Sequence, residues 1–373
     1  MSKRLLLASP HMSDEGYELQ YIHDAFQKNW IAPLGENVNE FEKDMGAYMG
    51  KGYPVALSSG TAALHLAMIL ADVKAGNTVF CQSLTFSASA NPVAYCGARP
   101  VFIDSERETW NMDPAALRRA FEQYGTPKAV VAVHLYGNPA KLDEIGALCR
   151  EHHVPLIEDA AEALGSTYNG QKCGTFGVFG GLSFNGNKII TTSGGGMLLC
   201  ESEKDARHAL KLATQARENA PWYQHEEIGY NYRMSNISAG IGRGQMNMLP
   251  LRVQQKRAIF ARYSENLQGL PLTMQPKLDC AEPNRWLSVL LLDSSCGVTP
   301  ADMLTRLDEE NIEGRYLWKP MNMQPVFADE PFVSVSDAPV CNDLFARGVC
   351  LPSDTKMSMD DVDHVCRVIR EMF

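Results

Sequence analysis

The sequence predicts an α/β fold, with a large domain built on a mostly parallel β-sheet and a smaller α+β domain at the C-terminus. Short, nearly continuous apolar runs alternate with helix-sized segments through the first two thirds of the 373 residues. Strands that are covered on both faces give this pattern. After about residue 245 the alternation ends, so we expect the large domain to cover residues 1–245 and the small domain residues 246–373.

Four apolar runs are the predicted strands of the parallel sheet, and they cover residues 78–81, 100–104, 129–133 and 155–159. A segment of helical length separates each run from the next, so right-handed crossovers should join the strands and keep them parallel. His134 and Asp159 stand at the carboxyl ends of two of these runs. Their side chains should therefore face a ligand crevice at that edge of the sheet.

The predicted helices between the strands cover residues 61–73, 87–96, 113–124 and 141–152. Asp113 is a suitable N-cap for the third helix, and Pro114 suits its first helical position. The elements expected in the C-terminal part are a long helix over 246–268, a strand over 286–292 and helices over 300–310 and 359–372.

Composition and charge exclude several classes of function. The formal net charge of −10 repels nucleic acid and anionic membranes, so a phosphorylated ligand would need a local basic or backbone N–H site. The N-terminal apolar run is broken by Pro10 and followed by Asp14, which makes it too short for a signal segment or a membrane span. We therefore expect a cytoplasmic protein with no nucleic-acid or membrane partner.

Ten cysteines are scattered through the chain without any C-x-x-C pair. Reduced, packed thiols are favoured over a disulfide framework or a metal site, so no metal is expected. The chain also contains no G-x-G-x-x-G or P-loop run, which removes the main support for a dinucleotide or P-loop site.

A lysine in a glycine-rich setting is the first candidate catalytic residue. Lys188 lies between the turn that contains Ser183 and the glycine cluster Gly194–Gly196. A lysine that is partly desolvated beside a phosphorylated cofactor can form an imine. The ordinary alternative for Lys188 is a solvated surface charge.

Two further motifs could complete a phosphate-cofactor site. Ser59, Gly60 and Thr61 begin a predicted helix, where free N–H groups and hydroxyls favour phosphate binding; a plain N-cap with a glycine turn is the alternative. Asp159 closes a predicted strand, and a carboxylate there can keep a pyridinium nitrogen protonated. An N-cap carboxylate is its alternative.

Aromatic and basic residues supply weaker signals. Phe86 follows a predicted strand and could lie on a cofactor ring, although an aromatic at such a junction is more often part of the core. The segments 229–236 and 315–320 combine aromatic residues with Arg233, Arg315 and Lys319. Both segments suit anion recognition, and both could equally be structured interface loops.

Together these motifs resemble, in type and order, the pyridoxal-phosphate-dependent nucleotide-sugar aminotransferases of the DegT/StrS family, over nearly the whole chain. The motifs that carry the resemblance are Ser59-Gly60-Thr61, Glu158-Asp159-Ala160-Ala161, Ser183-Phe184 ahead of Asn187-Lys188, and residues 229–233. The resemblance implies a fold-type I aminotransferase. The run from Ser183 to Gly196 is most similar to the branch that aminates a UDP-linked 4-keto-6-deoxy-N-acetylhexosamine on the route to bacillosamine.

The resemblance also implies roles for individual residues. Lys188 would bind the cofactor covalently and act as a catalytic base, and Asp159 would be the catalytic partner of the ring nitrogen. The other residues implied in binding pyridoxal phosphate are Gly60, Thr61, Ala62, Phe86, Glu162, Ser183 and Asn231. Because Asn231 would reach the phosphate from the partner subunit, a homodimer with shared sites is implied. The implied substrate-binding residues are Asn231, Arg233, Arg315, Lys319 and Asn322.

The activity implied is transfer of an amino group from L-glutamate to the C4 ketone of a UDP-linked 2-acetamido-4-keto-2,6-dideoxyhexose. A dTDP- or GDP-linked sugar is one alternative. A sugar dehydratase is another, although dehydratases of this family carry histidine where this chain has Lys188. A regulator that binds the cofactor without catalysis is the third. Asn322 departs from the family, since relatives commonly have histidine in that segment, and any contact made by that histidine stays open.

Overall fold

A mixed eight-stranded β-sheet forms the centre of the computed structural model, which describes residues 4–373. The first three residues of the N-terminal run therefore lie outside the described part of the chain. The strands are, in spatial order, β1 (Tyr53–Leu57), β9 (Gly196–Cys200), β8 (Phe179–Ser183), β5 (Leu156–Asp159), β4 (Ala129–Val133), β2 (Thr78–Gln82), β3 (Arg99–Ile103) and β14 (Phe332–Val333). All pairs are parallel except those of β9, which runs against β1 and β8.

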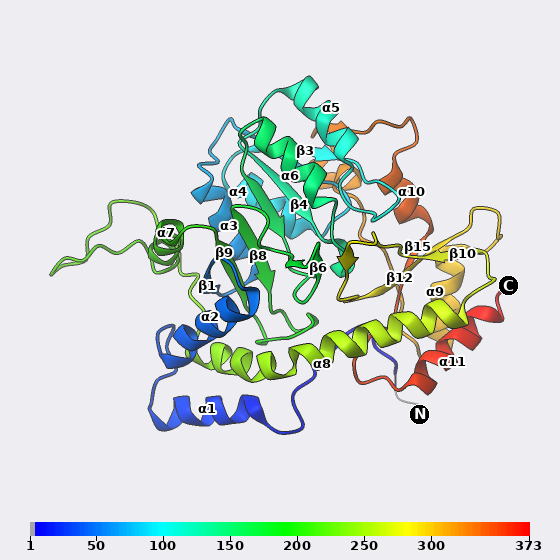
Figure 1. Cartoon of the computed structure of the whole chain (residues 1–373), viewed down its shortest axis with the longest axis horizontal. Coiled ribbons are helices and arrows are strands. Elements are labelled where there is room, and N and C mark those ends of the chain that lie inside the picture. Colours follow the sequence, from blue (N-terminus) through cyan, green and yellow to red (C-terminus); the bar gives the residue numbers. More distant parts are fainter. Residues whose placement is uncertain (1–3) are drawn as a thin grey trace.

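The four strands predicted from apolar runs correspond to β2, β3, β4 and β5 and are confirmed. Their side chains alternate between two apolar layers, as a strand period of two requires. Phe80 and Val130 contact the layer that contains α5 (Pro114–Tyr124) and α6 (Leu142–Glu151). The residues next to them point to the opposite layer. The sheet is thus covered on both faces, and the α/β prediction is confirmed (Figure 1).

The opposite face is covered by α3 (Gly60–Leu70), α4 (Asn91–Tyr95) and α7 (Glu203–Ala213). The predicted start of α5 is confirmed, because the Asp113 side chain accepts a hydrogen bond from the backbone of Ala115. The predicted helix over 87–96 is wrong in one respect. It is divided into a 3₁₀ turn, η1 (Ser87–Ser89), and α4, because Pro92 supplies no N–H to continue the first turn and instead begins a new helix.

A single long helix, α8 (Asn236–Asn266), runs along one side of the molecule (Figure 1). Two N-terminal helices, α1 (Tyr17–Gln27) and α2 (Glu36–Met49), pack against its first half, and α11 (Met359–Arg370) packs against its end. The prediction of a helix over 246–268 was therefore wrong about the start, which lies ten residues earlier.

Glycines explain why the first turns of α8 do not look helical in the sequence. Gly242 lies against the ring of Phe41, and a Cβ on it would approach that ring to 2.7 Å. Gly244 lies against the backbone of Glu18 and would approach it to 2.5 Å. These glycines have low helix propensity, but they allow α1 and α2 to pack closely against α8.

The C-terminal part forms its own antiparallel sheet, with the order β10 (Leu272–Met274), β12 (Ser288–Leu292), β15 (Gly348–Leu351) and β13 (Arg315–Tyr316). Helices α9 (Pro300–Glu309), α10 (Val340–Arg347) and α11 accompany it, so the expected strand and the two expected terminal helices are present. Side chains from the end of α8 complete this second core. The suggested boundary at 245/246 falls inside α8, and β14 returns to the large sheet.

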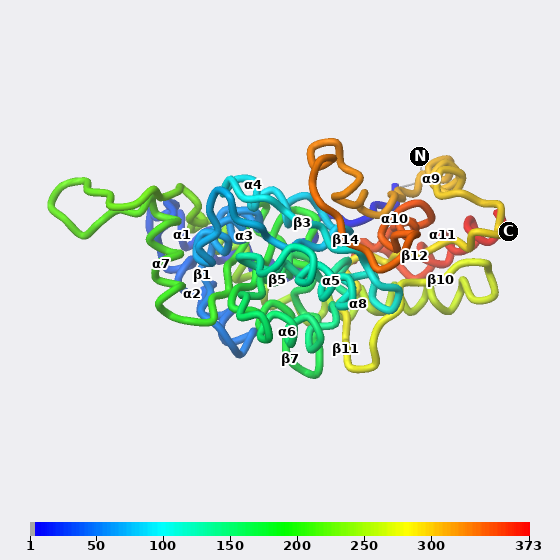
Figure 2. The backbone as a smooth tube through the Cα atoms, turned by 90° about the horizontal axis from the view of Figure 1, so that it is seen from above, coloured from blue at the N-terminus to red at the C-terminus, as the bar shows by residue number. Residues whose placement is uncertain are grey.

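The segment between α7 and α8 projects from the body of the protein. We call residues 214–231 the arm; it begins and ends at a bridge between Thr214 and Asn231. Its base is paired with α7 through Lys211, and its outer part projects beyond the other elements (Figure 2). Its tip and sides carry Trp222, Tyr223 and Ile228, which are 65%, 79% and 84% exposed.

Two general features of the described residues complete the fold. Among residues 4–373, no helix is long and apolar enough to cross a membrane. All ten cysteines lie in this part of the chain and none is joined to another.

Candidate active site

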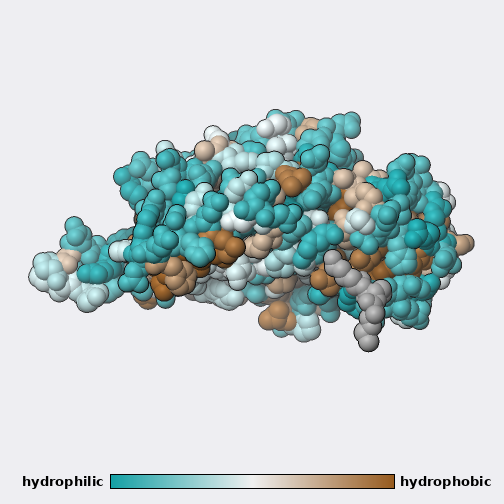
Figure 3. Space-filling model, turned by 90° about the horizontal axis from the view of Figure 1, so that it is seen from below, coloured by the Kyte–Doolittle hydropathy of each residue, from teal (hydrophilic) through white to brown (hydrophobic). Residues whose placement is uncertain are grey.

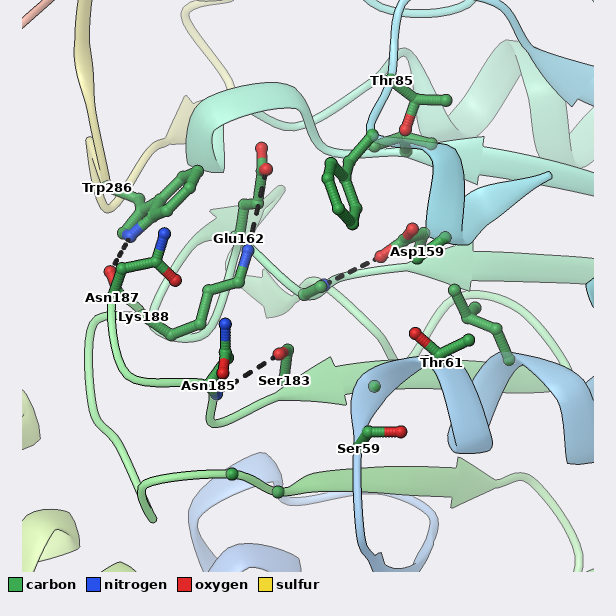
Figure 4. Close-up of a pocket in the computed structure, with 18 of the residues that line it drawn as sticks. Ser59, Thr61, Thr85, Asp159, Glu162, Ser183, Asn185, Asn187, Lys188 and Trp286 are labelled. Atoms are coloured by element: carbon green, nitrogen blue, oxygen red, sulfur yellow. Dashed lines mark hydrogen bonds and ion pairs between the residues drawn. The ribbon is translucent and has the colours of Figure 1, made fainter. Parts of the chain in front are cut away.

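A cavity of about 410 Å³ lies at the carboxyl ends of the parallel strands. It brings together the N-terminus of α3, the turn after β2, the end of β5 and the loop after β8 (Figure 4). Seven of the residues implied in catalysis or cofactor binding line it: Gly60, Thr61, Phe86, Asp159, Glu162, Ser183 and Lys188. Residues that are distant in the sequence therefore form one site.

Lys188 points into this cavity from the loop that follows β8. Its side chain is only 13% exposed, which excludes a solvated surface position. The Nζ atom lies 3.7 Å from Glu162 Oε1 and 4.1 Å from the centre of the Trp286 ring. The indole N–H of Trp286 donates to the carbonyl oxygen of Asn187 at 2.8 Å and so holds the lysine loop in place.

Glu162 is the acidic partner of Lys188 and is itself buried. Its Oε2 accepts a hydrogen bond from the backbone N–H of Tyr136 at 2.6 Å, and its Oε1 accepts one from the indole of Trp318 at 3.3 Å. Burial raises the pKa of the Glu162 carboxyl, and the nearby Lys188 charge opposes that rise. The cavity therefore holds a buried carboxyl group 3.7 Å from the lysine amine.

Asp159 occupies the last position of β5, on the side of the cavity away from Glu162. Its Oδ1 accepts a hydrogen bond from the backbone of Ala161 at 3.1 Å, and its Oδ2 accepts one from Ser89 at 2.5 Å. The helix N-cap alternative is wrong, because no α-helix begins after Asp159. The carboxylate instead faces the cavity.

The N-terminus of α3 forms a narrow, glycine-lined cradle. The Ser59 hydroxyl caps the helix by accepting from Ala62 N at 3.0 Å, so the N-cap interpretation is correct and Ala62 has its N–H partner within the chain. A Cβ on Gly60 would lie 3.0 Å from Ser183 Cβ. A Cβ on Gly196 would lie 2.4 Å from the backbone nitrogen of Gly60. Only glycines allow these three segments to meet.

Aromatic side chains form the remaining wall of the cavity. Phe86 is 53% exposed and lines the cavity, so the core alternative for it is wrong. Its ring centre lies 5.3 Å from that of Trp318. Trp286 and Trp318 also line the site. From the sequence, Trp318 was noted only as part of the segment 315–320 and Trp286 was given no role in the site, because no sequence pattern places these distant segments beside Lys188.

The residues expected to bind substrate do not line the cavity. Arg233 is buried, forms an ion pair with Glu42 and donates to the carbonyl oxygen of Ala56 at 3.1 Å. Asn231 is exposed at the base of the arm. Ala62, although implied in phosphate binding, is buried behind the cradle.

The segment 315–322 lies near the cavity, but its polar side chains have other partners or lie apart from it. Arg315 is exposed and pairs with Glu313 at 2.8 Å, and Lys319 is half-buried outside the lining residues. Asn322 accepts from the Ser83 hydroxyl at 2.7 Å and donates to Asn342 at 3.2 Å. Its amide is thus engaged within the chain.

The prediction that His134 faces the crevice was wrong. Its side chain is fully buried, with Nε2 2.9 Å from Glu158 and Nδ1 accepting from the backbone of Ala140. This fixes the proton on Nε2. The neighbouring Val133 lines the cavity instead, because successive residues of a strand point to opposite faces.

The cavity fits a phosphorylated pyridine aldehyde. The glycine cradle at the N-terminus of α3, with the hydroxyls of Thr61 and Ser183, suits a phosphate. The carboxylate of Asp159 suits a protonated ring nitrogen, Phe86 suits a flat ring, and the amine of Lys188 suits an aldehyde. Trp286, Trp318, Thr85, Asn185 and Asn187 complete the lining.

Comparisons with known proteins agree with this arrangement. The profile of the DegT/DnrJ/EryC1/StrS aminotransferase family matches residues 13–370. The chain is 53% identical to EpsN of Bacillus subtilis (strain 168), named as a candidate pyridoxal phosphate-dependent aminotransferase; the match covers 100% of this chain and 97% of EpsN. It is 33% identical to a GDP-perosamine synthase of Vibrio cholerae, over 96% of this chain and 97% of the relative.

The architecture is also found in solved structures. The aminotransferase TlmJ from Streptoalloteichus hindustanus superposes with a TM-score of 0.89 at 29% identity. The match covers 99% of this chain and 98% of TlmJ, so both the large sheet and the C-terminal part are included.

Proposed function

This chain belongs to the DegT/DnrJ/EryC1/StrS aminotransferase family and uses pyridoxal phosphate, and we propose that it makes a 4-amino sugar nucleotide. The proposed reaction moves the amino group of L-glutamate to the C4 ketone of a UDP-linked 2-acetamido-4-keto-2,6-dideoxyhexose. The observation that carries the proposal is the buried pair formed by Lys188 and Glu162 at one end of a phosphate-fitting cavity.

We propose that the cavity residues divide the binding of the cofactor among them. Gly60, Thr61 and Ser183 would hold its phosphate, Asp159 would hold its ring nitrogen and Phe86 would lie on the ring. When bound, pyridoxal phosphate supplies an electron sink that stabilises negative charge at a substrate carbon. The protein supplies orientation, a proton carrier and a site from which water is largely excluded.

Lys188 would carry the proton of the reaction. Its Nζ would accept a proton from the donor carbon and return it to an acceptor carbon. Glu162, at 3.7 Å, would stabilise the ammonium form that exists between the two transfers. The indole of Trp286 lies over the same Nζ and keeps water from it.

The choice of sugar nucleotide rests on the run from Ser183 to Gly196, which resembles the UDP-sugar branch of the family. A GDP-linked sugar is the second candidate, since a relative at 33% identity is named as a GDP-perosamine synthase; a dTDP-linked sugar is a third. Turnover with a panel of 4-keto-6-deoxy sugar nucleotides discriminates among them. Turnover of only the GDP- or dTDP-linked substrate would contradict the UDP assignment.

We also propose a homodimer in which the arm of each subunit reaches the site of the other. The arm exposes large apolar side chains, and hydrophobic surface also lies near the part of the body from which it projects (Figure 3). Asn231, at the arm base, would then contact the partner's phosphate site. Arg233, paired with Glu42, would act by holding this segment rather than by binding substrate.

The central experiment replaces the proposed proton carrier. We expect Lys188→Ala to lower turnover by at least 10⁴-fold and to remove the visible absorbance of the lysine-bound cofactor. The matched control is Lys172→Ala, because Lys172 also lies over an aromatic ring, that of Tyr48, but outside the cavity. Wild-type-like transfer by the Lys188 variant would overturn the assignment. Recovery of the absorbance by keto-sugar after bleaching with glutamate would exclude a non-catalytic regulator.

Two products separate transfer from dehydration. An aminotransferase releases 2-oxoglutarate and an amino sugar in equal amounts, whereas a dehydratase releases a sugar that has lost a hydroxyl group. Loss of the hydroxyl without incorporation of nitrogen would contradict the proposed function.

A further inference from the structure

A chain of two buried hydroxyl groups leads to the carboxylate of Asp159. The Ser89 hydroxyl lies 2.5 Å from Asp159 Oδ2, and the Thr85 hydroxyl lies 2.6 Å from that of Ser89. Ser89 is fully buried and Thr85 is 1% exposed. Both hydroxyls are therefore shielded from bulk water in the folded chain.

The direction of these hydrogen bonds follows from the chemistry of the groups. An ionised carboxylate can only accept, so the single hydroxyl proton of Ser89 is directed at Asp159. The hydrogen bond between Ser89 and Thr85 must then be donated by Thr85. The two hydroxyls form a directed series in which each group polarises the next toward the carboxylate.

The backbone fixes the position of Ser89. It ends the 3₁₀ turn η1, where its N–H donates to the carbonyl oxygen of Phe86 at 3.1 Å. Its own carbonyl oxygen accepts from Cys81 Sγ at 3.5 Å. The same short turn therefore carries the aromatic ring that lines the cavity and the hydroxyl that holds the carboxylate.

We propose that Ser89 is the residue that positions Asp159 for the cofactor ring, with Thr85 as the donor that orients Ser89. The proposal rests on the role proposed above for Asp159. Without the Ser89 hydroxyl, the carboxylate keeps one hydrogen bond from the described residues, the one donated by the backbone N–H of Ala161. The carboxylate could then rotate, and the cofactor ring nitrogen would lose a fixed partner.

The test uses Ser89→Ala in the full-length enzyme, with Ser353→Ala as the matched control. Ser353 is also a buried serine whose hydroxyl donates to a backbone carbonyl, that of Leu351, but it lies outside the cavity. A hydrogen bond to a charged group is lost only in the first variant. We expect Ser89→Ala to weaken pyridoxal phosphate binding about tenfold to hundredfold.

Three readouts distinguish positioning from a structural role. They are the dissociation constant of pyridoxal phosphate, the pH dependence of the visible absorbance of the bound cofactor, and the thermal unfolding of the apoenzyme. Ser89→Ala should change the first two, whereas Ser353→Ala should change only the third. If both variants lower the unfolding temperature alone, the proposal is overturned.

Two further variants keep the proposal separate from the assignment of Asp159. Thr85→Val preserves shape and removes the donor to Ser89, so we expect a smaller loss of affinity, about twofold to fivefold; an unchanged affinity would overturn the role of Thr85. Asp159→Asn should exceed the effect of Ser89→Ala. If Asp159→Asn binds the cofactor like wild type, the role of Asp159 itself is wrong. If only Ser89→Ala is wild-type-like, the positioning role alone is wrong.

Discussion

We call Asp159, Glu162 and the glycine cradle at the N-terminus of α3 the floor of the cavity. The side chains of the floor and those of the arm differ in where they find interaction partners. In the floor, Asp159 and Glu162 each accept two hydrogen bonds from groups of the same chain. In the arm, which projects from the body of the protein (Figure 2), Trp222, Tyr223 and Ile228 are more than three-fifths exposed. One chain supplies the hydrogen-bond donors of the floor, whereas the apolar side chains of the arm stay exposed in the single chain; we proposed above that a second copy covers them.

This difference separates two kinds of requirement. A buried carboxylate is stable only when the fold supplies its hydrogen-bond donors. The hydrogen bonds of the floor must therefore be in place before any ligand binds. Burial of exposed aromatic side chains against a partner lowers the free energy of the complex. Small substitutions in the floor should therefore change cofactor binding, whereas substitutions in the arm should change the association of subunits.

Among the substitutions that test this comparison, the largest effect is expected from crowding the cradle at the N-terminus of α3. A methyl group at position 196 would lie 2.3 Å from the carbonyl carbon of Ser59 and 2.4 Å from Gly60 N, and neither backbone atom can move without opening the cradle. We expect Gly196→Ala to weaken pyridoxal phosphate binding by more than a hundredfold, measured by titration of the apoenzyme.

The control is Gly194→Ala, because Gly194 also lines the cavity but a Cβ on it would meet nothing within 4 Å. We expect its affinity to stay within about threefold of the wild type. Equal affinities in the two variants would show that the cradle does not bind the phosphate.

An intermediate effect is expected from the arm. The double substitution Trp222→Ser and Tyr223→Ser removes apolar area that we assign to the partner interface. The dimer should therefore dissociate at a higher protein concentration than the wild type, and turnover should fall about tenfold. Light scattering during size-exclusion chromatography measures the first property. The unfolding temperature of the isolated subunit should not change.

Tyr124→Ser is the control for the arm, since Tyr124 is a 43% exposed tyrosine on α5. It should alter neither association nor turnover. A fully active monomer carrying the double substitution would show that the arm does not complete the partner's site.

The last prediction concerns a buried charge elsewhere in the fold. It tests whether this charge, like the carboxylates of the floor, depends on partners within the chain. Lys256 on α8 is buried beside Asp354, and burial lowers its pKa to about 7, while Asp354 opposes the shift. Between about pH 7 and pH 10 the unfolded chain binds this proton and the folded chain does not. The free energy of unfolding should therefore rise with pH in this window, by up to about 1.4 kcal/mol per unit.

Lys256→Met should remove that slope, and denaturant unfolding at a series of pH values would measure it. Below about pH 7 both states bind the proton, so no further change is expected there. The control is Lys204→Met, at an exposed position on α7. An unchanged slope in Lys256→Met would show that the Lys256 amine is solvated.

The sequence was sufficient for the parts of the site that follow from local rules. Parallel strands align their carboxyl ends, which accounts for the placement of Asp159 at the cavity. Ser183 was assigned by resemblance, because the strand that it ends, β8, was not predicted. Ser59 and Gly60 predict the start of a helix from residue type alone. Lys188 was identified by its glycine-rich surroundings and by resemblance.

Long-range pairing was not visible in the sequence. Arg233 looks like an anion-binding residue until Glu42, on α2, is brought beside it. His134 looks like a crevice residue until the buried Glu158 is brought within 2.9 Å of its Nε2 and accepts the hydrogen bond from that N–H. Trp286 precedes β12 and Trp318 follows β13, and only the tertiary fold brings them to the cavity that contains Lys188.

The long helix α8 limits how this protein can be recombined with its relatives. At 31 residues it spans roughly 46 Å, and it supplies side chains to the cores of both parts of the chain. A chimera joined at 245/246 would unite two half-helices whose buried faces were selected against different neighbours. A junction after Leu267, where α8 has ended, leaves that shared helix intact and is the better place to exchange C-terminal segments.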